Sequence, residues 1–209
     1  MRLISKSTLH SGRANGETEM GLYSMRKCKD TLLFRIAVFA YNSGLTPNKM
    51  TALGVSLGIC SGALLVFGEL PFALLCGFLS VFCDVLDGTI ARAFQEETFF
   101  GKVFDSVGDR VSETAIVVGA ILSGIIEPIG TIAIIGSISL LSLRALSYSR
   151  RLNTDYVLFG RAERLIFIFS GLLTPIKTIS TLLFVGAGFF GLASSFQIAT
   201  FLMRPTQLN

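Results

Sequence analysis

Four aspartates lie in a stretch of sequence that is otherwise apolar enough to cross a membrane, namely Asp84, Asp87, Asp105 and Asp109. Carboxylates at membrane depth are costly, so they are rare there unless they bind or move something. No cluster of histidines and cysteines accompanies them. Carboxylate oxygens without nitrogen or sulfur ligands favour hard divalent cations such as Mg²⁺ or Mn²⁺. The four aspartates therefore predict a metal site.

The spacing of the polar and small residues in this stretch predicts two helices that face each other. One helical face holds residues at steps of 0, 3, 4, 7 and 8, which are Asp84, Asp87, Gly88, Ala91 and Arg92. A second face holds residues at steps of four, which are Gly101, Asp105 and Asp109. A short polar turn between the helices would bring the two pairs of carboxylates together. The small side chains would leave room for a flat polar ligand beside the metal.

The string CDVLDGTIARAFQEETFFGKVFDSVGDR, residues 83–110, resembles the signature of the CDP-alcohol phosphotransferases, and every signature residue is present at the family's spacing. The resemblance extends more weakly over about residues 45 to 165. It implies transfer of a phosphatidyl or archaetidyl group from a CDP-linked lipid to an alcohol, with release of CMP. It also implies a homodimer. Gly54, Gly58 and Gly62 could pack helices closely, either between subunits or within one.

The resemblance also implies roles for single residues. Two metal ions bridged by carboxylates could neutralise the pyrophosphate and stabilise the leaving CMP. We expect Asp84, Asp87 and Asp105 as metal ligands, with Asp109 also near the metals and acting as general base. The residues that match family positions around the nucleotide are Asn48, Thr51, Gly88, Ala91, Arg92 and Gly101. Asn48 and Thr51 could equally mark a helix start, and Arg92 could anchor a helix end.

A group of arginines indicates a phosphorylated acceptor, because arginine is well suited to hold phosphate in a fixed pose. The stretch Gly160–Leu165 resembles part of the archaetidylinositol phosphate synthases and related enzymes, although residues 152–159 replace a longer polar insertion. Inositol phosphate is the expected acceptor, with glycerol 3-phosphate next and serine or inositol as further alternatives. The predicted acceptor-phosphate contacts are Lys102, Arg144, Arg150 and Arg164. Each of these could instead orient the protein or contact anionic lipids.

The composition indicates an all-α integral membrane protein. Of the 209 residues, 51% are hydrophobic and 15% charged, and the mean hydropathy is +0.66. No aromatic-interleaved basic stretch suggests a nucleic-acid partner. We expect a polar, partly disordered leader (1–25), an amphipathic juxtamembrane helix (26–43) and a catalytic domain of six transmembrane helices (44–209). The six apolar segments are 48–68, 71–94, 100–126, 129–150, 161–175 and 178–203.

The distribution of charge predicts the orientation in the cell membrane. Nearly all lysines and arginines fall at both termini and at alternate turns, and the opposite side holds only Lys177 beside Glu69 and Glu127. The positive-inside rule then predicts cytoplasmic termini and a cytoplasmic aspartate site. A cation transporter is an alternative, but it would more often carry its charges near the midplane on broken helices. A catalytically idle scaffold is disfavoured because all four aspartates are present.

Overall fold

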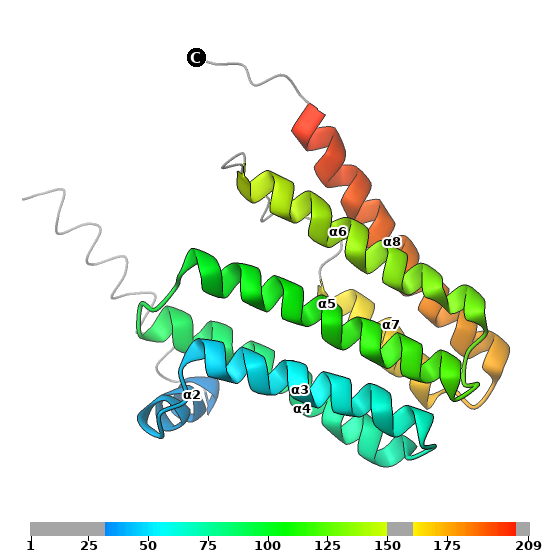
Figure 1. The fold of residues 1–209 in the computed structure, drawn as a ribbon, viewed down its shortest axis with the longest axis horizontal. Coiled ribbons are helices and arrows are strands. Elements are labelled where there is room, and N and C mark those ends of the chain that lie inside the picture. Colours follow the sequence, from blue (N-terminus) through cyan, green and yellow to red (C-terminus); the bar gives the residue numbers. More distant parts are fainter. Residues whose placement is uncertain (1–31, 150–160, 204–209) are drawn as a thin grey trace, which may run out of the picture.

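The computed structural model describes residues 32–149 and 161–203, and these ranges are helical throughout apart from short connections (Figure 1). The elements are α2 (Leu32–Asn42), α3 (Pro47–Val66), α4 (Leu70–Ala93), α5 (Phe99–Leu122), the 3₁₀ turn η1 (Pro128–Thr131), α6 (Ile132–Ser149), α7 (Arg161–Leu173) and α8 (Lys177–Met203). The predicted all-α class is confirmed for the described residues. The predicted leader 1–25 and the beginning of the predicted helix 26–43 lie outside them.

Local sequence signals account for several helix boundaries. Pro47 occupies the first turn of α3, where its missing N–H leaves no hydrogen bond unmade. The Thr98 hydroxyl accepts a hydrogen bond from the Gly101 backbone N–H at 2.9 Å and so caps α5. Helix α5 ends at Leu122, earlier than the predicted limit of 126, because Gly124 takes a positive φ of 75° that ends the helical path.

Three of the helices, α3, α4 and α8, are long and apolar enough to cross a membrane, so the chain is a membrane protein. Helix α7 has 13 residues, whereas a perpendicular span needs about 20. Helix α5 has 24 residues, but the aspartates and other charged side chains make it more polar than the three candidate spans. Length and composition of the described helices therefore support three spans, and they do not test the predicted count of six.

Close packing of α3 against both α4 and α5 brings the two aspartate-bearing helices to one site. Small residues make this possible: Gly54 faces Cys83 of α4, and Gly58 faces Ser112 of α5. A Cβ atom at Gly58 would lie 2.5 Å from the Ser112 Cβ, too close for any side chain without a shift of the helices. These glycines of α3 therefore serve contacts within the chain.

A second group consists of α6, α7 and α8, with α6 and α8 side by side in Figure 1. The two groups meet in one apolar core, in which the buried side chains include Leu65 of α3, Ile116 of α5 and Phe184 of α8. Helix α7 reaches this core through Leu165 and Phe169 and begins beside the aspartate site. The fold thus places the start of α7 opposite the aspartates of α4 and α5.

Helix α2 packs on α4 near the end of the bundle that carries the aspartates. Its Ala37 and Ala40 are buried against a cluster that includes Leu86 of α4, while Phe39 is 75% exposed. This two-sided character agrees with the amphipathic helix predicted from the sequence.

Candidate active site

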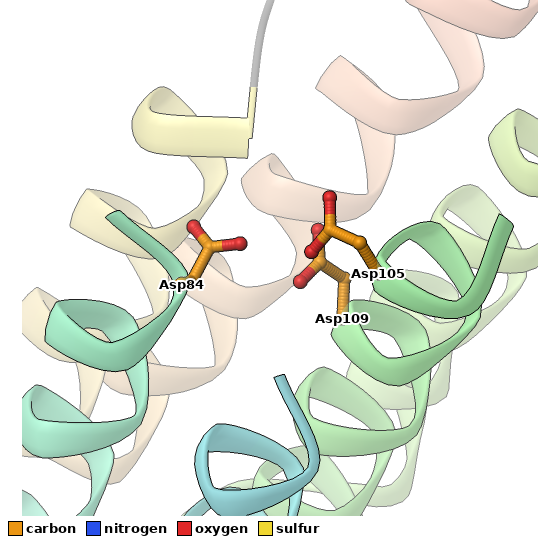
Figure 2. A group of neighbouring side chains, drawn as sticks. All are labelled: Asp84, Asp105 and Asp109. Carbon is orange, nitrogen blue, oxygen red and sulfur yellow. The ribbon is translucent and has the colours of Figure 1, made fainter. Parts of the chain in front are cut away.

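Three of the four predicted aspartates form one carboxylate cluster. Asp84 projects from α4, and Asp105 and Asp109 project from successive turns of α5 toward it (Figure 2). Each offers a carboxylate oxygen, and these oxygens all lie within 4.8 Å of one another. Oδ1 of Asp105 is buried and makes no hydrogen bond within the described structure, so it is available as a ligand. An all-oxygen donor set of this kind fits a hard divalent cation.

Asp87 lies at the junction between this cluster and a neighbouring cleft. Its side chain is buried, and Oδ2 accepts a hydrogen bond from the Thr51 hydroxyl at 2.6 Å. Asp87 lines the cleft together with Asp105, and both also border the small cavity beside Asp84 and Asp109. The hydrogen bond from α3 fixes the Asp87 carboxylate between the metal cluster and the cleft.

The cleft has a volume of about 440 Å³ and lies at the end of the bundle where α3 and α5 begin and α4 ends. All six residues that resemble nucleotide positions line it: Asn48, Thr51, Gly88, Ala91, Arg92 and Gly101. The turn between α4 and α5 completes the wall with Glu96, Glu97 and Thr98, which the sequence analysis did not single out. The structure therefore brings the predicted nucleotide residues together beside the carboxylate cluster.

Polar side chains lie close to the backbone at two glycines of the cleft, in ordinary contact range at Gly88 and more tightly at Gly101. The Arg92 guanidinium lies over Gly88, with Nη1 3.6 Å from where a Cβ would be. Asn48 Oδ1 lies 3.2 Å from the corresponding point at Gly101. A methyl group at Gly101 would crowd Asn48 and narrow the cleft between α3 and α5.

Basic side chains border the site on two sides. Lys102 lines the cleft and pairs with Glu97 at 2.9 Å. Arg161, the first residue of α7, forms ion pairs through Nη1 with Asp84 and with Asp109, the latter at 2.7 Å. The guanidinium of Arg161 thus joins α7 to both aspartate-bearing helices.

The other predicted acceptor residues are distributed differently. Arg164 is buried and donates from Nη2 to Glu113 Oε1 at 3.1 Å. Arg144 belongs to α6, but its side chain lies outside the described structure, as does the whole of Arg150. The predicted contact of these residues with an acceptor phosphate stays a prediction.

Residues 44–203 match the family described as CDP-alcohol phosphatidyltransferase. The chain belongs to this family. It is 33% identical to the archaetidylinositol phosphate synthase of Methanothermobacter thermautotrophicus over 148 residues, which cover 70% of this chain and 72% of that protein. It is also 33% identical to the phosphatidylinositol phosphate synthase of Mycobacterium marinum over 140 residues, covering 61% and 58%.

The fold agrees with this assignment. The crystal structure of Mycobacterium tuberculosis phosphatidylinositol phosphate synthase with CDP-DAG bound matches 84% of this chain and 96% of that one, with a TM-score of 0.71 and 23% identity. The phosphatidyltransferase described here thus shares the overall helical arrangement of that enzyme. It is an enzyme of phospholipid biosynthesis, as its signature predicted.

Two features of the phosphatidyltransferase site were missed or left undecided by sequence reasoning. Arg161 was not among the predicted phosphate contacts, and Glu113 was not among the predicted site residues. A signal was present in their spacing, because Asp109 and Glu113 are one turn apart in α5 and Arg161 and Arg164 one turn apart in α7. This spacing would let the two acids of α5 pair with the two arginines of α7. The sequence alone could not show it, because it does not tell that α5 and α7 are neighbours.

Proposed function

We propose that this phosphatidyltransferase moves a phosphatidyl or archaetidyl group from a CDP-linked lipid to inositol phosphate and releases CMP. The observation that carries the proposal is the cleft of about 440 Å³ that shares Asp87 and Asp105 with the carboxylate cluster. A nucleotide in this cleft would hold its pyrophosphate beside the aspartates. The names of both relatives, which make inositol phosphate lipids, favour inositol phosphate as the acceptor.

We assign the four aspartates as ligands for two divalent cations, Mg²⁺ or Mn²⁺. The carboxylate oxygens of Asp84, Asp105 and Asp109 are close enough to share an ion, and Asp87 adjoins them on the nucleotide side. When bound, the ions would neutralise the pyrophosphate and make the lipid-bound phosphorus more electrophilic. A solved structure of the Mycobacterium tuberculosis phosphatidylinositol phosphate synthase was determined in complex with manganese.

The chain's own residues would hold the donor and move one proton. Arg92 would hold a phosphate oxygen with its planar guanidinium, and Asn48 and Thr51 would face the cytidine. Asp109 would accept the proton of the acceptor hydroxyl. The hydroxyl oxygen then forms a bond to the lipid-bound phosphorus, and the bond from that phosphorus to the CMP oxygen breaks. Gly88, Ala91 and Gly101 would let the nucleotide lie against the helix backbones.

The acceptor phosphate would bind on the side of the cluster bordered by α7. We assign Arg144 and Arg150 to this phosphate, with Lys102 reaching it from the cleft and Arg164 behind them, buried against Glu113. Arg161 adds a further guanidinium at the same edge, because it pairs with Asp84 and Asp109 one turn before Arg164. Glycerol 3-phosphate carries the same phosphate group and is the alternative acceptor.

We further propose six membrane spans, α2 lying in the membrane interface, a cytoplasmic active site in the cell membrane, and a homodimer. Helix α5 can span despite its charges because Arg110, Ser112 and Glu113 are turned inward and buried. Helix α2 exposes Arg35 and Phe39 one turn apart, a combination suited to the membrane interface.

The decisive test measures CMP release from CDP-diacylglycerol by the purified protein with Mg²⁺ or Mn²⁺. Inositol phosphate, glycerol 3-phosphate, inositol and serine are supplied separately. Release with inositol phosphate alone is the expected result, and chelation should stop it until either ion is restored. Release with glycerol 3-phosphate instead would be consistent with the proposed transfer at the aspartate site, but it would show that inositol phosphate is not the acceptor.

A further inference from the structure

Three charged side chains outside the cleft are almost completely buried. Arg110, Glu113 and Arg164 retain exposed fractions of 4%, 3% and 3%. Removing such groups from water is costly, and a pair of buried charges contributes little net stability compared with apolar side chains of similar size. Stability alone is therefore a weak reason for this cluster.

The cluster joins three helices through one carboxylate. Glu113 of α5 accepts a hydrogen bond from Arg110 Nη1 at 2.9 Å and another from the Ser137 hydroxyl of α6, both on Oε2. The second oxygen, Oε1, accepts from Arg164 Nη2 of α7 at 3.1 Å. Because each carboxylate oxygen is used, Glu113 fixes the Arg164 guanidinium relative to both α5 and α6.

The ion pairs between α5 and α7 form two successive levels. Arg161 pairs with Asp109 at the level of the carboxylate cluster, and Arg164 pairs with Glu113 one turn deeper. Asp109 belongs to the cluster that would take up metal, whereas Glu113 lines neither the cleft nor the cavity beside it. Only the Glu113 level can hold α7 in the same way whether or not the cluster is engaged with a substrate.

We propose that Glu113 is a positioning residue: through Arg164 it anchors the first turn of α7, so that Arg161, which borders the cavity beside the cluster, faces the acceptor phosphate. This inference rests on the proposed function, because it assumes a phosphorylated acceptor at that edge. Glu113 itself touches neither the donor nor the acceptor. Its role is to fix the position of the Arg161 guanidinium by holding Arg164, which an amide at position 113 would do poorly.

The test compares Glu113→Gln with Arg110→Gln, a matched control that removes the other ion pair of the same carboxylate. Arg110 lies on α5 with Glu113, so its loss leaves the link to α7 intact. Two measurements are made on the purified full chain. The first is the KM for acceptor and for CDP-lipid in the CMP-release assay, and the second is hydrogen–deuterium exchange of the α7 amides.

For Glu113→Gln we expect the acceptor KM to rise about tenfold, which corresponds to ~1.4 kcal/mol of binding, with the CDP-lipid KM changed less than about twofold. The amides of the first turn of α7 should exchange faster, since opening that turn becomes less costly. Arg110→Gln should leave the acceptor KM and the α7 exchange close to those of the wild type. Glu113→Asp, which keeps the charge, should restore part of the acceptor affinity.

Unchanged α7 exchange in Glu113→Gln would overturn the proposal, as would equal effects of Glu113→Gln and Arg110→Gln on the acceptor KM. If the wild type releases no CMP with any phosphorylated acceptor, the proposed function fails. In that case the exchange measurement alone still decides whether Glu113 anchors α7, so the two failures can be told apart.

Discussion

Asp109 and Asp87 occupy opposite sides of the carboxylate group, and their neighbours differ accordingly. Asp109 pairs with Arg161 at the start of α7. Asp87 accepts the Thr51 hydroxyl of α3 and faces the cleft. Under the proposed function the acceptor and the nucleotide therefore meet different aspartates, and substitutions on the two sides should affect different kinetic constants.

Asp109→Asn should lower kcat by about 10²- to 10⁴-fold, the range expected when a general base is lost. Binding of the CDP-lipid should remain measurable, because the cleft residues are unchanged. Turnover and equilibrium binding of the lipid are measured on the same preparation. An Asp109→Asn enzyme within tenfold of wild-type turnover would show that Asp109 is not the base.

Thr51→Val provides the contrast on the nucleotide side. It removes the hydrogen bond to Asp87 and should raise the KM for the CDP-lipid more than it lowers kcat.

Much of the site could be predicted from the sequence because its residues recur at helical steps along two adjacent helices. The three cluster aspartates and four of the cleft residues (Gly88, Ala91, Arg92 and Gly101) depend on this local pattern, whereas Asn48 and Thr51 were predicted from the family resemblance. All of them do come together. The pairing of Arg161 with Asp84 and Asp109 could not be predicted in this way. It joins segments distant in the sequence, and the choice among several arginines depends on how α7 is rotated against α5.

At the scale of elements, α2 contacts the turn between α4 and α5, and that turn forms one wall of the cleft. The Tyr41 ring stacks on Phe94 with centroids 3.8 Å apart, and its hydroxyl donates to Glu96 Oε1 at 2.7 Å. The hydrogen bond to Glu96 raises the pKa of Tyr41, because accepting the proton of the phenol favours its protonated form. Gln95, between the two contacted residues, has a positive φ of 56°. The turn therefore relies on α2 to hold an uncommon backbone conformation.

Tyr41→Phe should raise the KM for the CDP-lipid by about two- to fivefold, a small effect because the lost hydrogen bond to the Glu96 carboxylate is exposed to water. The acceptor KM should change less, because Tyr41 contacts Phe94 and Glu96 on the nucleotide side of the site. The stacking on Phe94 is kept, so the variant isolates the hydroxyl. Steady-state kinetics with each substrate varied in turn provide the measurement. A change confined to the acceptor KM would show that α2 does not act through the nucleotide cleft.

Helix positions were also largely predictable, because proline and glycine interrupt the apolar segments. Predicted segments 71–94 and 178–203 agree with α4 and α8 to within a residue at each end. The third segment was drawn too long because residues 123–126 are mostly apolar, although Gly124 already ends the helix. Hydropathy measures how well residues tolerate lipid, and it does not report where a backbone leaves the helical conformation.

At the scale of the whole molecule, the two ends of the bundle differ in charge and function. The cleft and the carboxylate cluster lie at the end where α3, α5 and α7 begin. The opposite end, where α5 ends and α8 begins, has an exposed ion pair between Glu127 and Lys177 at 2.7 Å. From the positive-inside rule we expect the end with the cleft to face the cytoplasm, where water-soluble CMP would be released.

This orientation can be tested with single cysteines at two exposed positions, Ser43 near the cleft end and Glu127 at the other. In a Cys28→Ser background, Glu127→Cys should react with a membrane-impermeant maleimide in intact cells, whereas Ser43→Cys should react only after permeabilisation. The remaining native cysteines lie within α3 and α4, and the background protein without either new cysteine measures their contribution. The opposite labelling pattern would put the cleft outside the cell. Labelling of both positions in intact cells would mean that α3, α4 and α5 do not cross the membrane in alternation, and the six-span arrangement would then be wrong.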